Sequence, residues 1–181
     1  MERELMELLI FPNPILLKKC REVEPYDQEA LAVLDGMVNK LYEWNGVGLA
    51  APQVGISKRM VVIDVRGEPS IVYKLINPKI VWKSEEIQKS KEGCLSLPLL
   101  REEVARHESV IVEYLDENFS RQHVEATGLL SCCLQHELDH LDGILYIHRL
   151  GKLKKIRAIQ KFKKLQQELK EQCGGEETLR I

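Results

Sequence analysis

The apolar positions near both ends of the chain recur at helical spacing. After Asp27, a typical N-cap residue, leucine and valine return every three to four positions until Asn45-Gly46, which predicts an amphipathic helix over residues 28–44. A second apolar stripe, flanked by lysines and arginines, predicts a basic amphipathic helix over about 150–172. The members of this second stripe are Leu153, Ile156, Ile159, Phe162, Leu165 and Leu169.

The middle of the chain has the pattern of β-strands. Residues 59–65 and 71–81 are rich in valine and isoleucine and are separated by the turn-forming Gly67-Glu68-Pro69, which predicts a strand pair. Residues 109–115 alternate in polarity, and residues 121–126 are their expected hairpin partner. Because strands cluster in the middle and helices lie near the ends, the order of elements favours an α+β fold.

Three further segments are interpreted as turns or loops. Residues 1–26 contain three prolines (Pro12, Pro14 and Pro25) and are expected to wrap the surface. Residues 46–55 are rich in glycine and alanine, either to bring backbone close to a ligand or to form a tight turn against the core. Residues 92–98 are interpreted as a loop that presents Cys94.

Composition narrows the class of protein. The 181 residues, 44% of them hydrophobic and 30% charged, fit one soluble domain over residues 1–172, with a frayed tail at 173–181. The net charge of −2 gives no general reason to expect nucleic acid or a membrane as partner. The five cysteines are odd in number and follow no disulfide spacing, which favours a reducing compartment and a cytoplasmic location.

The strongest candidate chemistry lies in a predicted helix over residues 128–141. On a helix, His136 and His140 lie one turn apart on one face, where both imidazoles can bind one metal ion. Glu137 could then take a proton from a water molecule as a general base. The alternative is that these side chains only cap and solvate a partly buried helix. Tyr146 stands where one large class of such enzymes has its third ligand, so that ligand is better sought upstream.

Three separated motifs closely resemble those of bacterial peptide deformylases. They are Gly46-Val47-Gly48-Leu49-Ala50-Ala51-Pro52-Gln53, Glu92-Gly93-Cys94-Leu95-Ser96 and Gln135-His136-Glu137-Leu138-Asp139-His140. The resemblance runs from about Phe11 to the start of the basic helix. It implies mixed, mainly antiparallel sheets packed around a central helix that carries the HExxH motif.

The resemblance also implies a mechanism. Cys94, His136 and His140 would bind one divalent metal, Fe²⁺ foremost, with Zn²⁺, Ni²⁺ or Co²⁺ as alternatives. Glu137 would be the general base. The side chain of Gln53 and the backbone N–H of Leu95 would stabilise the negative oxygen that develops as formate is removed from N-formylmethionine.

Further residues acquire expected roles in the same way. Gly48 would lie alongside the substrate backbone, Arg101 would steady the peptide or the second motif, and Asp139 would orient a metal ligand. The basic helix could contact ribosomal RNA, or it could simply be a solvated helix packed on the domain. A monomer is assumed. The residues expected to line the methionine pocket are Val47, Leu129, Cys132 and Cys133.

Two rival interpretations stay open. A deformylase-like protein could have lost catalysis and act as a metal-binding or interaction module, although Cys94, Gln53 and Glu137 are all present. A zinc endopeptidase of another fold is disfavoured by the missing downstream ligand. The departures from the family pattern, at His148 and at Ser90-Lys91, affect the rim of the pocket rather than the chemistry.

Overall fold

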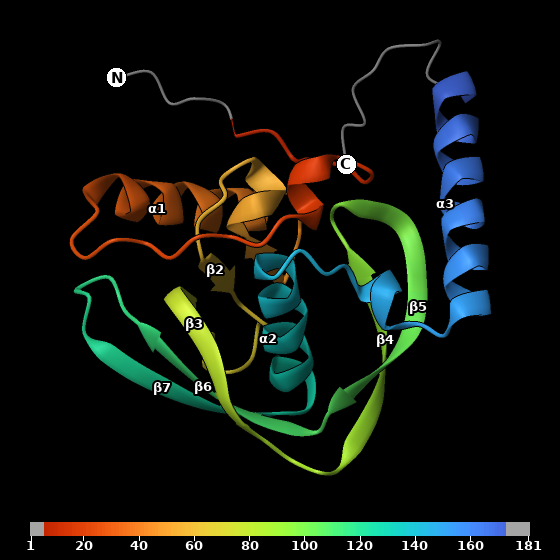
Figure 1. Ribbon diagram of the computed structural model, residues 1–181. Helices are drawn as coiled ribbons and strands as arrows, with labels where there is room; N and C mark the ends of the chain where they lie inside the picture. Colours follow the sequence, from red (N-terminus) through yellow and green to blue (C-terminus); the bar gives the residue numbers. More distant parts are fainter. Residues whose placement is uncertain (1–5, 173–181) are drawn as a thin grey trace.

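A computed structural model describes residues 6–172 (Figure 1). In it a central helix, α2, lies between a five-stranded antiparallel sheet and a long two-stranded hairpin. This arrangement confirms the predicted α+β fold. The helices and strands are α1 (Gln28–Glu43), β1 (Gly48–Ala50), β2 (Met60–Ile63), β3 (Tyr73–Lys83), β4 (Ile87–Cys94), β5 (Leu97–His107), β6 (Ser109–Leu115), β7 (Arg121–Thr127), α2 (Gly128–Leu141) and α3 (Lys152–Gln172), with 3₁₀ helices η1 (Pro14–Leu17), η2 (Ala51–Val54) and η3 (Tyr146–Arg149).

The larger sheet has the strand order β1-β2-β3-β6-β7, with every neighbouring pair antiparallel. Both predicted strand pairs are present. Met60 of β2 lies opposite Ile76 of β3, and Ser109 of β6 lies opposite Thr127 of β7. Valines and isoleucines from these strands form one hydrophobic core with α2.

The first helix begins as predicted. The side chain of Asp27 accepts a hydrogen bond from the backbone N–H of Ala30 at 3.0 Å, which satisfies one of the free amides of the first turn. Leu34, Met37 and Leu41 are fully buried against β1, β2 and η2. The helix therefore packs against the glycine-rich segment, which contains β1 and η2.

Two predictions of loops need correction. Residues 92–98 are not a loop, because β4 and β5 form an antiparallel hairpin and only Leu95 and Ser96 make the turn. The glycine-rich segment 46–55 contains the short strand β1 and the 3₁₀ helix η2. Neither hairpin strand was predicted, because β4 is exposed or half-exposed along most of its length and its sequence has no apolar alternation.

The N-terminal segment connects η2 with the turn of the β4–β5 hairpin, and both of these carry candidate site residues. The backbone N–H of Leu9 donates to the carbonyl of Gln53 at 2.8 Å, and that of Phe11 donates to the carbonyl of Ser96 at 2.9 Å. The sequence predicts that residues 1–26 wrap the surface in extended or turn conformations. In the described part, residues 6–26, the structure has the short helix η1 and an isolated bridge between Arg21 and Lys58, and Leu16, Cys20 and Val23 are buried. The structural role of this segment is to hold η2 and the hairpin turn together.

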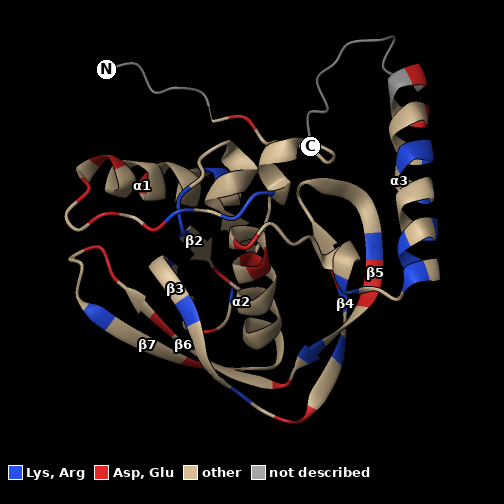
Figure 2. Ribbon diagram, in the orientation of Figure 1, with Lys and Arg blue, Asp and Glu red and all other residues tan. Residues whose placement is uncertain are grey.

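The basic helix α3 lies at the edge of the molecule beside β5 (Figure 1). Phe162 and Ala158 are buried against the hairpin, but Leu153 and Ile156, expected to belong to the same buried stripe, are exposed. The first turn of α3 contacts β5 through a polar side chain, because Lys154 donates to the carbonyl of Glu103 and pairs with Glu102. Lysines and arginines gather along this first part of α3 (Figure 2). The predicted tail at 173–181 lies outside the described residues, and the division into one domain stays a prediction.

None of the helices within residues 6–172 combines the length and the apolarity that a membrane crossing requires. The cysteines of this part of the chain, Cys20, Cys94, Cys132 and Cys133, are all free thiols.

Candidate active site and metal centre

Helix α2 places two imidazoles and a carboxylate in the interior. Every residue from Ser131 to Leu141 is buried, because sheet strands cover one side of the helix and the hairpin covers the other. The rings of His136 and His140 lie 5.0 Å apart between centroids, as expected for residues one turn apart. Glu137 is 4% exposed, and within residues 6–172 its Oε2 atom has no hydrogen-bond partner.

The hairpin brings the third candidate ligand to the same point. Cys94 is the last residue of β4, and its Sγ atom lies 3.2 Å from Nε2 of His140. The ligand atoms of Cys94, His136 and His140 all lie within 4.8 Å of one another. The upstream ligand expected from the sequence is therefore close enough to share one ion with the two histidines.

The residues of this group fit a transition metal. A thiolate and two imidazoles are ligands that Zn²⁺ and Fe²⁺ accept, and three protein ligands are typical of catalytic metal sites. Burial lowers the pKa of His140 well below its ordinary value, whereas in His136 the hydrogen bonds with Cys94 and Glu92 outweigh burial and raise the pKa. A bound metal would require both imidazoles to be neutral. Tyr146 is no ligand: its hydroxyl donates to the carbonyl of Leu100, and its ring stacks on His136.

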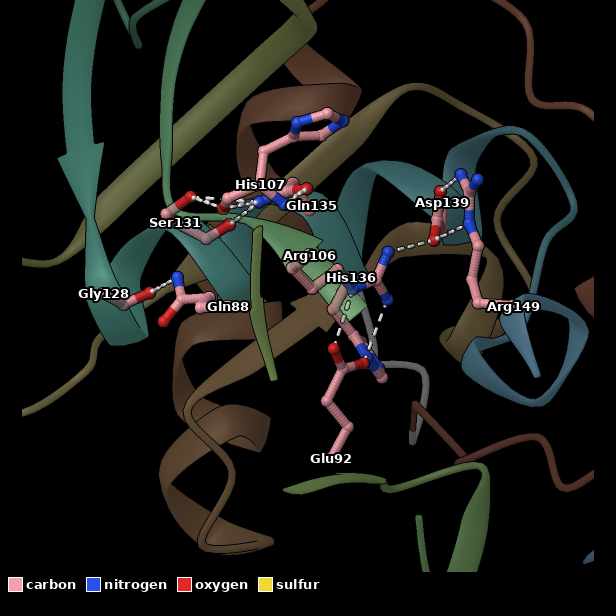
Figure 3. Close-up of polar contacts among 10 residues, drawn as sticks. All are labelled: Gln88, Glu92, Arg106, His107, Gly128, Ser131, Gln135, His136, Asp139 and Arg149. Carbon is pink, nitrogen blue, oxygen red and sulfur yellow. Dashed lines mark hydrogen bonds and ion pairs between the residues drawn. The ribbon is translucent and has the colours of Figure 1, made fainter. Parts of the chain in front are cut away.

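A buried network of charged side chains holds the first histidine (Figure 3). Nδ1 of His136 lies 2.8 Å from the carboxylate of Glu92, which makes two further hydrogen bonds with Arg106, at 2.7 and 2.9 Å. Arg106 also donates to Asp139 at 2.6 Å, and Asp139 binds Arg149. Asp139 was expected to orient a metal ligand, but its carboxylate contacts two arginines. The residue that contacts the ligand is Glu92.

Sequence reasoning did not identify Glu92 or Arg106 as site residues. Burial alone would raise the pKa of Glu92, but the hydrogen bonds from Arg106 and His136 outweigh it and lower this pKa to about 2. Glu92 is therefore ionised at neutral pH and fixes which nitrogen of His136 faces the candidate metal group. The available signal was an acidic residue two positions before a candidate ligand, with an arginine later in the same polar stretch.

The substitution Glu92→Gln is expected to weaken metal binding by about 10- to 100-fold, because the amide cannot replace the charge that orients His136. A chelator competition titration would measure the affinity. Glu102→Gln is the matched control, since Glu102 lies opposite Glu92 in the hairpin and, among the described residues, its carboxylate forms an ion pair with Lys154 alone. Equal affinities for the two variants would contradict this role of Glu92.

Gln53 is held in one orientation by its neighbours. Its side-chain oxygen accepts from the backbone N–H of Ala50 at 2.9 Å, so the NH₂ group must point the other way. That group donates to the hydroxyl of Ser96 at 3.1 Å and lies 3.5 Å from Sγ of Cys94. Leu95, the other predicted oxyanion donor, directly follows Cys94 in the hairpin turn. Both predicted donors therefore adjoin the candidate metal group.

Gly48 packs directly against the candidate general base. A Cβ atom at this position would lie 2.3 Å from Oε1 of Glu137 and 2.9 Å from Sγ of Cys133. Such distances are far below van der Waals contact, so any side chain would displace the carboxylate. Only glycine leaves Glu137 where the structure places it.

Gly48→Ala is therefore expected to lower kcat by roughly 100-fold, since displacing a catalytic group by about 1 Å can cost this much. The measurement is the turnover number at matched metal content. Gly151→Ala is a suitable control because a Cβ atom there would meet no atom of residues 6–172 within 4 Å. Wild-type turnover in Gly48→Ala would show that the position of Glu137 is not critical.

Burial also sets the acidity of the candidate base. Loss of solvent raises the pKa of Glu137 to about 7. A cation beside it would favour the ionised form. A carboxyl group with a pKa near neutrality can both accept and return a proton at physiological pH.

A cavity of about 450 Å³ opens beside these groups. Cys132 and Cys133 are buried within it, whereas Val47 and Leu129 are exposed at its mouth. Arg101 lies over Gly93, the residue before Cys94. The structure thus brings together all the residues predicted to bind substrate, which are Val47, Gly48, Arg101, Leu129, Cys132 and Cys133.

Fold and site together define a class of α+β proteins in which a hairpin cysteine joins the two histidines of a central HExxH helix. A family model that describes polypeptide deformylase matches residues 5–156. A peptide deformylase of Methylocella silvestris is 44% identical over 165 residues, 88% of this chain and 84% of the relative. One of Agrobacterium fabrum is 43% identical over 159 residues, 87% of this chain and 94% of the relative.

The solved structures that resemble this fold are also peptide deformylases. The crystal structure of a peptide deformylase from Legionella pneumophila superimposes with a TM-score of 0.83 at 36% identity, covering 90% of this chain and 96% of that one. The enzyme from Synechococcus elongatus, in complex with actinonin, gives a TM-score of 0.81 at 37% identity, covering 89% of both chains. The protein belongs to the peptide deformylase family.

Proposed function

We propose that this protein removes the formyl group from N-formylmethionine at the start of nascent polypeptides by metal-dependent hydrolysis, releasing formate. The observation that carries the proposal is the convergence of the Cys94, His136 and His140 candidate ligand atoms within 4.8 Å, beside a buried carboxylate with an oxygen that no described residue hydrogen-bonds. Such an arrangement suits hydrolysis of an amide better than simple metal storage.

Cys94, His136 and His140 would hold the metal. When bound, the ion would supply Lewis acidity, which activates water and polarises a carbonyl. Glu137 would take the proton of the attacking water on a carboxylate oxygen and deliver it to the leaving amine nitrogen. Gln53 Nε2 and the Leu95 N–H would donate to the oxygen that becomes negative during attack. Both donors are fixed before the reaction, so little reorganisation is needed.

The cavity would bind the N-terminal methionine of the substrate. Leu129, Cys132, Cys133 and Val47 would surround its side chain, which is flexible and apolar and suits an irregular pocket. The substrate backbone would lie along Gly48 as an added strand. This is sterically reasonable because β1 is an edge strand of its sheet. Arg101 would steady the peptide or the hairpin beside Cys94.

Fe²⁺ is the proposed native metal, by family resemblance, with Zn²⁺, Ni²⁺ and Co²⁺ as alternatives. Elemental analysis after anaerobic purification would identify it. The proposed location is the cytoplasm, where the thiols stay reduced, and the proposed form is a monomer. Ribosome contact through α3 is a further proposal supported by its lysine density. Ribosome binding by the protein that weakens steeply with added salt would support this contact.

The direct test is incubation of the metal-loaded protein with a formyl-Met tripeptide. We expect stoichiometric formate and an intact, deformylated peptide. Internal cleavage would favour the endopeptidase alternative. Metal binding without formate release would favour a non-catalytic relative.

A further inference from the structure

A bulge interrupts the hairpin directly after Cys94. Gly93 pairs with Arg101 and Cys94 pairs with Leu97, so one step along β4 corresponds to four along β5. The three residues between Leu97 and Arg101 therefore have no partner on β4. Bulges beside active sites commonly redirect a side chain.

This bulge turns two leucines inward and one outward. Leu97 and Leu100 are each 1% exposed and pack in the core that supports the hairpin. Leu99, between them, is 65% exposed, the largest fraction among the apolar residues that line the cavity. Its side chain therefore contributes little to the core.

The backbone of Leu99 makes this side chain more unusual. Its φ of +64° lies in the left-handed region, which glycine and asparagine adopt far more readily than leucine. Glycine at this position would avoid the steric conflict and would lose only the minor part of the leucine surface that the fold covers. Neither local conformation nor packing within the fold explains a leucine here.

The position of Leu99 indicates what could cover it. It lines the same cavity as Gln53, Cys94 and Glu137, and Val47 and Leu129 are exposed at the same mouth. A substrate whose formylmethionine occupies the centre must lead its following residues out past this mouth. In an extended peptide, alternate side chains point to the same side, so one of the next two residues would face Leu99.

We propose that Leu99 forms a subsite for an apolar side chain at the second or third residue of the substrate peptide. The inference rests on the proposed function. It makes Leu99 a specificity-determining residue: burial of its exposed surface would favour peptides with a large apolar residue at that position over peptides with a small polar one.

The test compares formyl-Met peptides that carry leucine or serine at the second residue and, separately, at the third. For the wild type we expect kcat/KM to favour leucine at one of these positions by roughly three- to tenfold, as burial of part of an aliphatic side chain would give. Leu99→Asn should reduce this ratio to within about twofold, mainly through KM, because uniform binding is lost. Leu99→Met should keep most of the preference.

Ile87→Asn is the matched control, since Ile87 is an exposed aliphatic residue on the same hairpin that does not line the cavity. It should keep the wild-type ratio. Thermal unfolding should show Leu99→Asn no less stable than the wild type, which separates loss of the subsite from misfolding.

The subsite would be overturned if the wild type showed no preference for leucine at either position, or if Leu99→Asn kept the wild-type preference. In both cases formate release would still support the proposed function. Absence of formate release from every formyl peptide would overturn both.

Discussion

Glu137→Gln is expected to lower kcat for formate release by about 10²- to 10⁴-fold while leaving the metal in place, because a positioned general base contributes this much. The carboxylate is 4% exposed, and one of its oxygens has no hydrogen-bond partner within residues 6–172, so it is poorly stabilised by the described part of the fold. Glutamine keeps the shape and cannot accept the proton. We therefore also expect the thermal midpoint of the variant to equal or exceed that of the wild type.

The measurement is the turnover number, with metal content determined on the same samples. Glu113→Gln, on the exposed side of β6, removes a carboxylate far from the chemistry and should behave like the wild type. If Glu137→Gln turned over at a near-normal rate with full metal, another group would have to move the proton.

Cys94→Ala is expected to weaken metal binding by more than about 100-fold, which exceeds the effect of changing a residue around the ligands. Its sulfur lies 3.2 Å from Nε2 of His140, so its loss would remove one of the three candidate donors and the negative charge that a thiolate would supply. Anaerobic metal titration would give the affinity.

The control for this variant is Cys20→Ala. Cys20 is also a buried free thiol, but it lies in the core beneath the sheet, apart from the candidate metal group. The Cys20→Ala variant should therefore bind metal as tightly as the wild type. Stoichiometric, tightly held metal in Cys94→Ala would remove the thiolate from the ligand set.

Local patterns were sufficient to predict α1, the β6–β7 hairpin and α2. In α1 and the β6–β7 hairpin the apolar period agrees with the buried face, as with Leu34 and Leu41 of α1, whereas α2 is buried on all sides from Ser131 to Leu141. The β4–β5 hairpin could not be predicted in this way. Its polar residues pair across two strands, and its few apolar contacts, such as Leu97 and Val104, are made with distant segments that include Tyr146 and Phe162.

The site residues also divide into those that the sequence motifs predict and those that only the fold reveals. Motif resemblance indicated Cys94, His136 and His140, but the contact between Glu92 and His136 joins residues 44 positions apart. No sequence period encodes such a contact. The position of Leu99 likewise depends on a register shift that only the paired strands reveal.

X-ray absorption spectroscopy at the metal edge of anaerobically purified protein tests the central claim most directly. We predict one sulfur and two imidazole nitrogens among the ligands of each metal ion, at about 2.3 Å and about 2.0–2.1 Å respectively in the zinc-loaded form. A metal environment without sulfur, or with only oxygen ligands, would contradict the assignment of Cys94, His136 and His140 and the hydrolysis derived from it.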